Sequence, residues 1–258
     1  MTPATQAATE LLRAEQTGVP VAPLRLTHGL ATAQQAYEVQ FATLQLKRSQ
    51  GRRVVGWKIG LTNPVMQQAF GISEPDYGAL LDDMAVAPGT AVPAASLIAP
   101  RVEPELAFRV KQDVGTQAVT LSNIEDYLDG VWLALEIVDS RIANWDIHLA
   151  DTIADNASSG RFVLGDTLLA LADVDMLHTE AELLVNGQPA GRGTSQQVMG
   201  TPLAAVVWLI EKLQHYGVPV QQGEVLLSGA ICNAVPVQAG DAVVGRFAGL
   251  GEVRCTLS

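Results

Sequence analysis

The sequence predicts an α+β fold around a mostly antiparallel sheet that is sandwich-like or rolled. Two helical patterns occupy residues 1–52, and short β-type runs dominate residues 53–258. These runs are spaced too irregularly for a strict alternation of strand and helix. With 258 residues and 48% hydrophobic content, the chain can bury a substantial core. We therefore expect one domain over 1–258, with a helical N-terminal segment (1–52) and a β-rich core (53–258).

Two helices are expected in the N-terminal segment. Thr2 can cap the first, and Pro3 can occupy its first helical position. The second runs from about Thr32 to Gln50. The proline-containing stretch 18–23 separates them, because each proline biases its predecessor toward extended conformations.

The β-type runs are rich in β-branched and aromatic residues and lie at 54–59, 102–110, 131–138, 161–164, 181–185, 224–227, 242–247 and 251–257. Asn186-Gly187 directly after one run predicts a two-residue hairpin turn.

Three further helices are expected between the strands, over residues 63–71, 122–130 and 202–216. A capping box of Ser122 with Glu125 predicts the second of these. The third has Thr201 as a cap, apolar residues at helical spacing and Gly217 as a terminator.

The composition of the chain argues against several classes of binding partner. The chain has 16 basic and 27 acidic residues, and its net charge of -11 is the wrong sign for a phosphate backbone, so we expect no nucleic-acid partner. No basic start precedes an apolar run at the N-terminus, and no apolar stretch approaches ~18 residues, so neither an export signal nor a membrane span is expected. Cys232 and Cys255 lack a CxxC spacing and the four histidines are scattered, which argues against zinc. A reduced, cytoplasmic enzyme fits these features.

Three glutamates among apolar neighbours predict a divalent-metal site. Glu103 and Glu105 share one face of a strand, because side chains alternate along it. Two carboxylates on a solvated face would explain that pair equally well. Glu136, however, lies in a strand that is apolar on both faces, where it must be paired, protonated or metal-bound. Pro104 predicts an edge or irregular position for the first pair. Carboxylate oxygens are the ligands that Mg²⁺ or Mn²⁺ prefers.

Each of the other candidate polar residues also has a purely structural interpretation. Lys58 precedes a turn at Gly60 and a predicted helix start, a favourable setting for a substrate carboxylate, but a half-buried surface lysine would look the same. Asp76 lies in a Pro-Asp-x-Gly pattern that is ordinary turn chemistry. Asp151 and Asp155 would share a helical face, where they either cap the helix or line a polar pocket.

Together, five motifs resemble the 2-oxopent-4-enoate hydratase and 4-oxalocrotonate decarboxylase family, which belongs to the fumarylacetoacetate hydrolase superfamily. They occur in the family's order at residues 56–62, 74–78, 101–105, 135–141 and 151–160. The resemblance implies a fumarylacetoacetate hydrolase-like mixed β-sandwich or roll, with flanking helices and the N-terminal helical segment.

The resemblance also implies a metal-binding catalytic domain. A Mg²⁺ or Mn²⁺ ion would be held by Glu103, Glu105 and Glu136. A small-molecule 2-oxo or 2-hydroxydienoic acid would chelate the ion through its carboxylate and 2-oxo oxygens. The ion would then act as a Lewis acid that stabilises an enolate.

Five further positions receive roles from the resemblance. Lys58 and Asp76 are expected to be catalytic, Lys58 by neutralising substrate oxygens and Asp76 by proton transfer or water activation. Thr62, Asp155 and Ser158 are expected to contact the substrate.

The reaction depends on finer features. Asp76 favours a hydratase that acts on a 2-hydroxy-2,4-dienoate, because the decarboxylases tend to lack an acid there. Residues 157–161, Ala-Ser-Ser-Gly-Arg, are closer to the decarboxylase pattern and keep that alternative open. An inert accessory subunit is a third interpretation, against which the intact glutamates and Lys58 argue. We expect a symmetric homo-oligomer, association with a pathway partner enzyme, and a place in aromatic or steroid ring catabolism.

Overall fold

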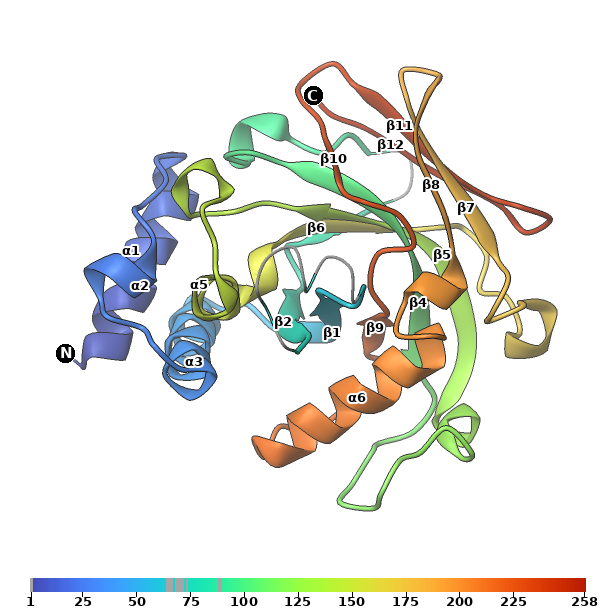
Figure 1. The fold of residues 1–258 in the computed structure, drawn as a ribbon, viewed down its shortest axis with the longest axis horizontal. Helices are drawn as coiled ribbons and strands as arrows, with labels where there is room; N and C mark the ends of the chain where they lie inside the picture. The colour runs from blue at the N-terminus through green and yellow to red at the C-terminus, as the bar shows by residue number, and fades with distance from the viewer. Residues whose placement is uncertain (1, 64–66, 68–71, 73, 88–89) are drawn as a thin grey trace.

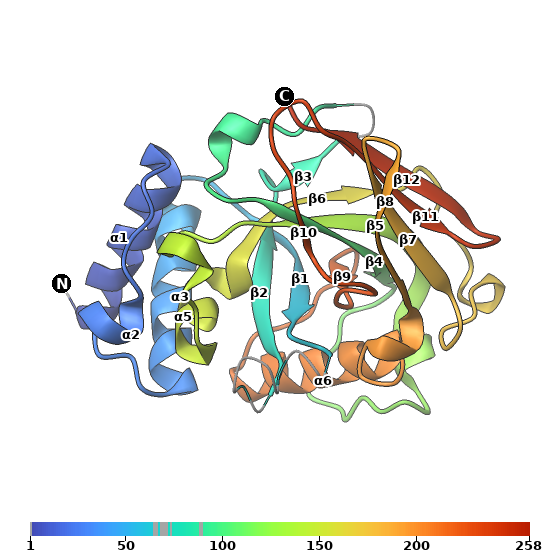
Figure 2. The ribbon, with the colours of Figure 1, turned by 45° about the horizontal axis from the view of Figure 1, so that its top comes forward.

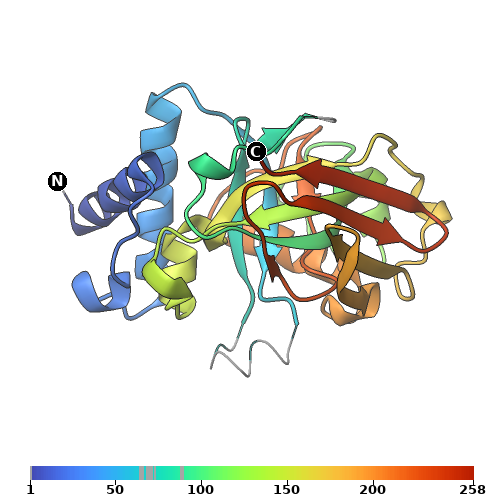
Figure 3. The same cartoon turned by 90° about the horizontal axis from the view of Figure 1, so that it is seen from above.

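The computed structural model describes residues 2–63, 67, 72, 74–87 and 90–258. A larger curved sheet forms the centre, a smaller sheet packs against part of it, and helices flank them (Figure 1). Seen from above, the N-terminal helices lie at one end of the molecule and the smaller sheet at the other (Figure 3). This arrangement confirms the predicted α+β class with mixed sheets.

Among the described residues, the α-helices are α1 (Pro3–Thr17), α2 (Leu24–Thr27), α3 (Ala33–Ser49), α5 (Leu149–Ala154) and α6 (Pro202–His215). The larger sheet contains β1 (Val54–Gly60), β2 (Asp76–Leu81), β3 (Ala85–Val86), β4 (Arg101–Val110), β5 (Leu128–Val138), β6 (Ser159–Leu164), β9 (Val225–Leu227) and β10 (Val235–Pro236). The smaller sheet contains β7 (Glu180–Val185), β8 (Gln188–Thr194), β11 (Ala242–Phe247) and β12 (Gly251–Thr256).

The strand order of the larger sheet is β2-β1-β9-β4-β5-β6-β3, with β10 beside β4. Its pairings are antiparallel except for β1 with β9 and β3 with β6. The smaller sheet, in the order β12-β11-β7-β8, is antiparallel throughout and contacts β4, β5 and β6. The predicted mostly antiparallel character is therefore confirmed.

Local signals predicted the N-terminal helices correctly. The Thr2 hydroxyl accepts the Thr5 N–H at 3.2 Å, which caps α1. A capping box of Thr32 with Gln35 starts α3. The short helix α2 was not predicted. Residue 52, the expected end of the helical N-terminal segment, lies between α3 and β1. The single catalytic domain over 1–258 stays a prediction.

All eight expected β-type runs overlap strands, and Asn186 and Gly187 (φ 52° and 76°) form the predicted turn between β7 and β8. No expected run covers the strands β2, β3, β8 and β10, although the hairpin signal implies a partner strand for β7 where β8 lies. Asp76 begins β2 and is buried, so the turn interpretation of its motif is wrong. Pairing with β1 overrides the local turn preference there.

Two of the three later helices can be judged. The helix expected over 63–71 falls largely outside the described residues. The one expected over 122–130 is wrong, because the capping signal gives only a short 3₁₀ helix (Ile124–Tyr127) before β5 begins. Pairing along β4 extends β5 through Gly130. The third is confirmed as α6, although the Thr201 hydroxyl makes no capping hydrogen bond.

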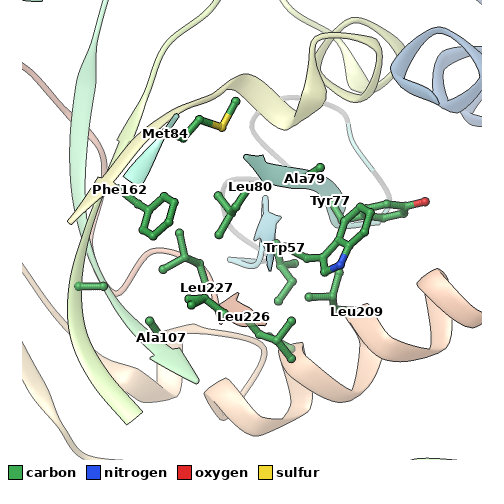
Figure 4. Close-up of a cluster of buried hydrophobic side chains, with 14 of the residues drawn as sticks. Trp57, Tyr77, Ala79, Leu80, Met84, Ala107, Phe162, Leu209, Leu226 and Leu227 are labelled. Carbon is green, nitrogen blue, oxygen red and sulfur yellow. The ribbon is translucent and has the colours of Figure 1, made fainter. Parts of the chain in front are cut away.

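The core between β1, β2, β9 and α6 orients the site residues (Figure 4). Trp57 of β1 and Leu226 of β9 are buried close to Leu209 of α6. Burying each such side chain contributes about 1.5–3 kcal/mol, which holds β1 in place. Because side chains alternate along a strand, Lys58 points to the face of β1 opposite Trp57. On the other side, α3 and α5 lie beside β2 (Figure 2).

Candidate metal centre and active-site pocket

The three predicted acids meet at the middle of the larger sheet. Glu103 and Glu105 lie on β4, and Glu136 lies on β5 directly opposite Glu103 in the antiparallel register. One carboxylate oxygen from each residue lies within 4.8 Å of the others. Strand pairing thus brings together groups more than thirty positions apart in the sequence.

The chemistry of this cluster fits a divalent cation. Glu105 and Glu136 are fully buried, and neither oxygen of Glu136 accepts a hydrogen bond among the described residues. Glu105 Oε2 accepts the Gly229 N–H at 2.8 Å, while its Oε1 has no such partner. Buried carboxylate oxygens that accept no hydrogen bond are costly, and these are hard oxygen ligands in a close group. A doubly charged cation would satisfy them.

The pKa shifts have the same cause. Burial, followed by the charge of Glu136, raises the pKa of Glu103 to about 8. Burial also raises the pKa values of Glu105 and Glu136, and neighbouring carboxylates add to the increase for Glu105. Each acid is thus hard to ionise beside the other two, and the charge of Lys58 offsets only part of this effect.

Pro104 occupies an irregular position rather than an outer edge. β4 pairs with β5 along its whole length and, on its other side, with β10 near its start and β9 near its end. Pro104 lies in the gap between β10 and β9, where its carbonyl accepts the Ile231 N–H at 3.0 Å. The proline therefore disrupts no ladder hydrogen bond, and of the two predicted alternatives the irregular one is confirmed.

Lys58 is a buried part of the site and not a surface lysine. Its Nζ lies 3.2 Å from Glu136 Oε1 and donates to the Ala157 carbonyl at 2.9 Å. Burial alone would lower the pKa of Lys58, but the charges of Glu136 and Asp76 outweigh it and raise the pKa. The side chain therefore carries its positive charge in the pocket.

Asp76 is also buried beside this group. Its Oδ2 accepts the Thr152 hydroxyl at 2.8 Å, and its Oδ1 has no hydrogen-bond partner among the described residues. Burial raises the pKa of Asp76, and Lys58 and Thr152 offset only part of that increase. A β-carbon at Gly60 would lie 2.2 Å from Asp76 Oδ1, so only glycine allows the close approach of β1 to this carboxylate. A carboxyl group in this setting can exchange protons.

Thr62 and Ser158 line the same pocket. Ser158 ends the short turn Asn156–Ser158, and its buried hydroxyl has no hydrogen-bond partner in the described part of the chain. Thr62 is buried against Gly229, where a β-carbon would lie 2.5 Å from its side chain. The Ser158 hydroxyl is therefore placed to meet a polar ligand, and Thr62 borders the same space.

Asp155 lies neither in the glutamate cluster nor in the lining of the pocket. It follows the C-terminal end of α5, and its Oδ1 accepts Arg141 Nε at 2.5 Å. Burial raises the pKa of Asp155 to about 6, while Arg141 partly offsets the increase. This carboxylate is bonded to a buried arginine and does not line the pocket, so its substrate contact stays a prediction. Asp151 has the predicted capping role, with Oδ2 accepting the His148 N–H at 3.0 Å.

The pocket that joins these groups has a volume of about 520 Å³. Its lining includes residues that sequence reasoning did not assign to the site, namely Arg101, Trp145, Arg192, Gln197, Cys232 and Asn233. The Arg101 guanidinium stacks on Trp145 at 4.4 Å from the ring centre. Arg101 precedes Glu103 by two positions, so the alternation that paired Glu103 with Glu105 could have placed it on the same face. The others come from separate segments and carry no comparable local signal.

The sequence matches the family described as fumarylacetoacetate (FAA) hydrolase C-terminal over residues 63–258. The chain belongs to the fumarylacetoacetate hydrolase family. This family member is 43% identical over 249 residues to the 2-keto-4-pentenoate hydratase of Paraburkholderia xenovorans (strain LB400), which covers 96% of this chain and 93% of that protein. It is 40% identical over 244 residues to the 2-hydroxyhexa-2,4-dienoate hydratase of Comamonas testosteroni, with 94% and 91% covered.

The solved structure of another protein has the same fold as this chain. The 4-oxalocrotonate decarboxylase from Pseudomonas putida G7, complexed with magnesium and adipate, superposes with a TM-score of 0.94 at 30% identity. The match covers 99% of this chain and 97% of that chain. The family and fold predicted from the five motifs are confirmed. Among the described residues, no helix combines the length and apolar character needed to cross a bilayer.

Proposed function

We propose that this chain is a metal-dependent hydratase, a carbon-oxygen lyase. It adds water to a 2-hydroxy-2,4-dienoate of the 2-hydroxypenta-2,4-dienoate type and yields a 4-hydroxy-2-oxo acid. One observation carries the assignment: the buried Asp76, whose Oδ1 has no hydrogen-bond partner among the described residues, lines the same pocket as Lys58 and Glu103. The two relatives named as hydratases support this choice.

The roles of the chain's residues follow from this reaction. Glu103, Glu105 and Glu136 would hold a Mg²⁺ or Mn²⁺ ion. When bound, that ion supplies Lewis-acid polarisation of the 2-oxo group. The Lys58 ammonium group lies beside Glu136, where it neutralises and orients substrate oxygens. The Thr62 and Ser158 hydroxyls contact the substrate.

Asp76 is the proton carrier. The substrate loses its 2-hydroxyl proton and gains one at C5, which leaves a ketone conjugated to the C3–C4 double bond. Water then adds at C4 and a proton at C3, so one water molecule is consumed overall. Asp76 Oδ1, which has no partner in the part of the chain that the structure describes, can accept and return these protons, because burial raises the pKa of Asp76.

The hydratase assignment can be tested directly. The protein is incubated with 2-hydroxypenta-2,4-dienoate and Mg²⁺, and ultraviolet absorbance of the diene is followed together with the yield of 4-hydroxy-2-oxopentanoate. We expect decay well above the metal-only control, with product formed in equal amount. Absorbance that decays no faster than this control would refute the assignment for that substrate.

A carboxy-lyase is the second candidate, supported by the close fold match to a 4-oxalocrotonate decarboxylase. Release of CO₂ from 2-oxohex-3-enedioate separates the two reactions, since hydration loses no carbon. The inert accessory subunit is disfavoured because Lys58 and the three glutamates are all present and close together.

We further infer a cytoplasmic homo-oligomer that associates with a pathway partner and acts in aromatic or steroid ring catabolism. The substrate class supports the catabolic role, and the symmetry common among metabolic enzymes supports the oligomer. Light scattering of the purified protein would measure the assembly.

A further inference from the structure

The turn Asn156–Ser158 has a backbone that non-glycine residues seldom adopt. Asn156, Ala157 and Ser158 have φ values of 55°, 50° and 53° in succession. The left-handed region is rarely used by non-glycine residues, and runs of it are rarer still. Such a backbone persists only where surrounding contacts over-determine it. Some part of the protein must therefore hold this turn.

Two features of the pocket depend on the turn. The Ala157 carbonyl accepts Lys58 Nζ at 2.9 Å and so fixes the position of the ammonium group. The next residue, Ser158, presents its buried hydroxyl to the pocket. Movement of the turn would therefore displace two groups that face the substrate.

Arg141 donates hydrogen bonds to both ends of the turn. Its Nη2 donates to the Asp155 carbonyl at 2.5 Å, and its Nη1 donates to the Ser159 carbonyl at 2.7 Å. These carbonyls belong to the residues directly before and after the left-handed stretch. The Asp155 carboxylate, which accepts Arg141 Nε, holds the guanidinium plane in this orientation. A planar fork with several fixed donors suits this geometry, and a lysine cannot reproduce it.

The opposite side of the turn is tied to β2. The Asn156 side chain accepts the Ala79 N–H at 2.8 Å and donates to the Ala79 carbonyl at 2.9 Å. A β-carbon at Gly78 would lie 2.2 Å from the Asn156 carbonyl oxygen, so this contact is close. The turn is thus held between β2 and the arginine, and Lys58 reaches it from β1.

We propose that Arg141, oriented by Asp155, is a positioning residue that holds the left-handed turn and thereby places Lys58 and Ser158 for catalysis. The expected effect on kcat rests on the proposed function, whereas the stabilisation of the turn by Arg141 does not. The competing explanation is a buried ion pair that stabilises the fold without affecting the pocket.

The first test compares two conservative variants. Arg141→Lys keeps the charge but cannot bridge both carbonyls. Arg25→Lys is the matched control, because Arg25 pairs with Asp151 at the start of α5 and touches no part of the turn. We expect Arg141→Lys to lower kcat about 10–100-fold, the scale expected for a misplaced catalytic group. KM should change much less, and Arg25→Lys should keep the kcat of the unmodified protein. Equal kcat values for the two variants would overturn the proposal.

A rescue experiment addresses the backbone. Ala157→Gly removes the β-carbon that disfavours a positive φ, so the turn depends less on the arginine. We expect Arg141→Lys with Ala157→Gly to regain a large part of the lost kcat. Ala154→Gly, within helical α5, is the control and should restore nothing. A double variant no more active than Arg141→Lys would contradict the proposal. If Arg141→Lys does not fold, Asp155→Asn replaces it in both comparisons.

Amide hydrogen exchange tests, without any substrate, whether Arg141 stabilises the turn. The Asp139 N–H donates to the Ser158 carbonyl at 2.8 Å, and the Ser158 N–H donates to the Asp155 carbonyl at 3.0 Å. In Arg141→Lys we expect both amides to exchange at least tenfold faster, while core amides of α6 are unchanged. Unaltered exchange rates would refute the stabilisation of the turn by Arg141. If the unmodified protein has no hydratase activity but both amides exchange faster in Arg141→Lys, the proposed function is wrong and the role of Arg141 in the turn is supported.

Discussion

Glu105 combines a complete lack of exposure with one oxygen that has no partner in the described part of the chain. Glu105→Gln keeps the size of the side chain and an acceptor for the Gly229 N–H, but it removes the charge that a cation needs. We expect Mn²⁺ affinity to fall at least tenfold in calorimetric titration, and activity to be lost, with the circular dichroism spectrum unchanged. Glu224→Gln, another buried acid whose Oε2 accepts Trp57 Nε1, should retain the affinity. Equal Mn²⁺ affinities for both variants would show that Glu105 is not a metal ligand.

Thr152 provides a pH test of Asp76. Its hydroxyl stabilises the ionised form of Asp76, which lowers the pKa, so Thr152→Val should raise the already elevated pKa further. If catalysis begins with ionised Asp76, the acidic limb of the kcat/KM profile should then move to higher pH. Thr43→Val removes a buried hydroxyl bonded within α3 and serves as the control. An unmoved acidic limb would mean that Asp76 is not the group that titrates.

The contact between β2 and the Asn156–Ser158 turn predicts the effect of a single methyl group. Gly78→Ala would place a β-carbon against the Asn156 carbonyl oxygen, so either the strand or the turn must shift. We expect a loss of about 1–3 kcal/mol in the free energy of unfolding, measured with urea, and a lower kcat because the Lys58 partner moves. Gly115→Ala meets only the flexible end of Gln117 and should be neutral within about 0.5 kcal/mol.

Elements with strong local signals were predicted well. A cap predicted α1, and helical spacing predicted α6. The helix expected from about Thr32 to Gln50 is confirmed as α3. β2 was missed because its motif also suits a turn, and the expected helix over 122–130 was wrong because pairing with β4 outweighs a capping signal. Among site residues, Glu103, Lys58, Asp76, Thr62 and Ser158 line the pocket, and Glu105 and Glu136 cluster with Glu103. Asp155 pairs with Arg141 outside the lining. Propensity is a weak preference that long-range pairing can override.

Metal binding should stabilise the whole molecule. Three close carboxylates in the centre of the larger sheet repel one another, and a divalent cation would remove that cost. At 100 times its dissociation constant, a ligand that binds only the folded protein adds roughly 2.7 kcal/mol. We expect Mn²⁺ to raise the Tm of chelator-treated protein by about 5 °C or more in calorimetry. Glu105→Gln should lose this increase, and a full increase in that variant would place the cation elsewhere.

The sequence by itself determined the features that depend on near neighbours. The alternation of Glu103 and Glu105, the apolar strand around Glu136 and the capped N-terminal helices all follow from local spacing. Only the tertiary structure decided which distant groups meet. It paired Glu103 with Glu136, joined Lys58 to a carbonyl 99 positions away, and turned Asp155 toward Arg141. The physical reason is that strand register and the direction of a buried side chain are set by packing across the whole core, which local spacing does not encode.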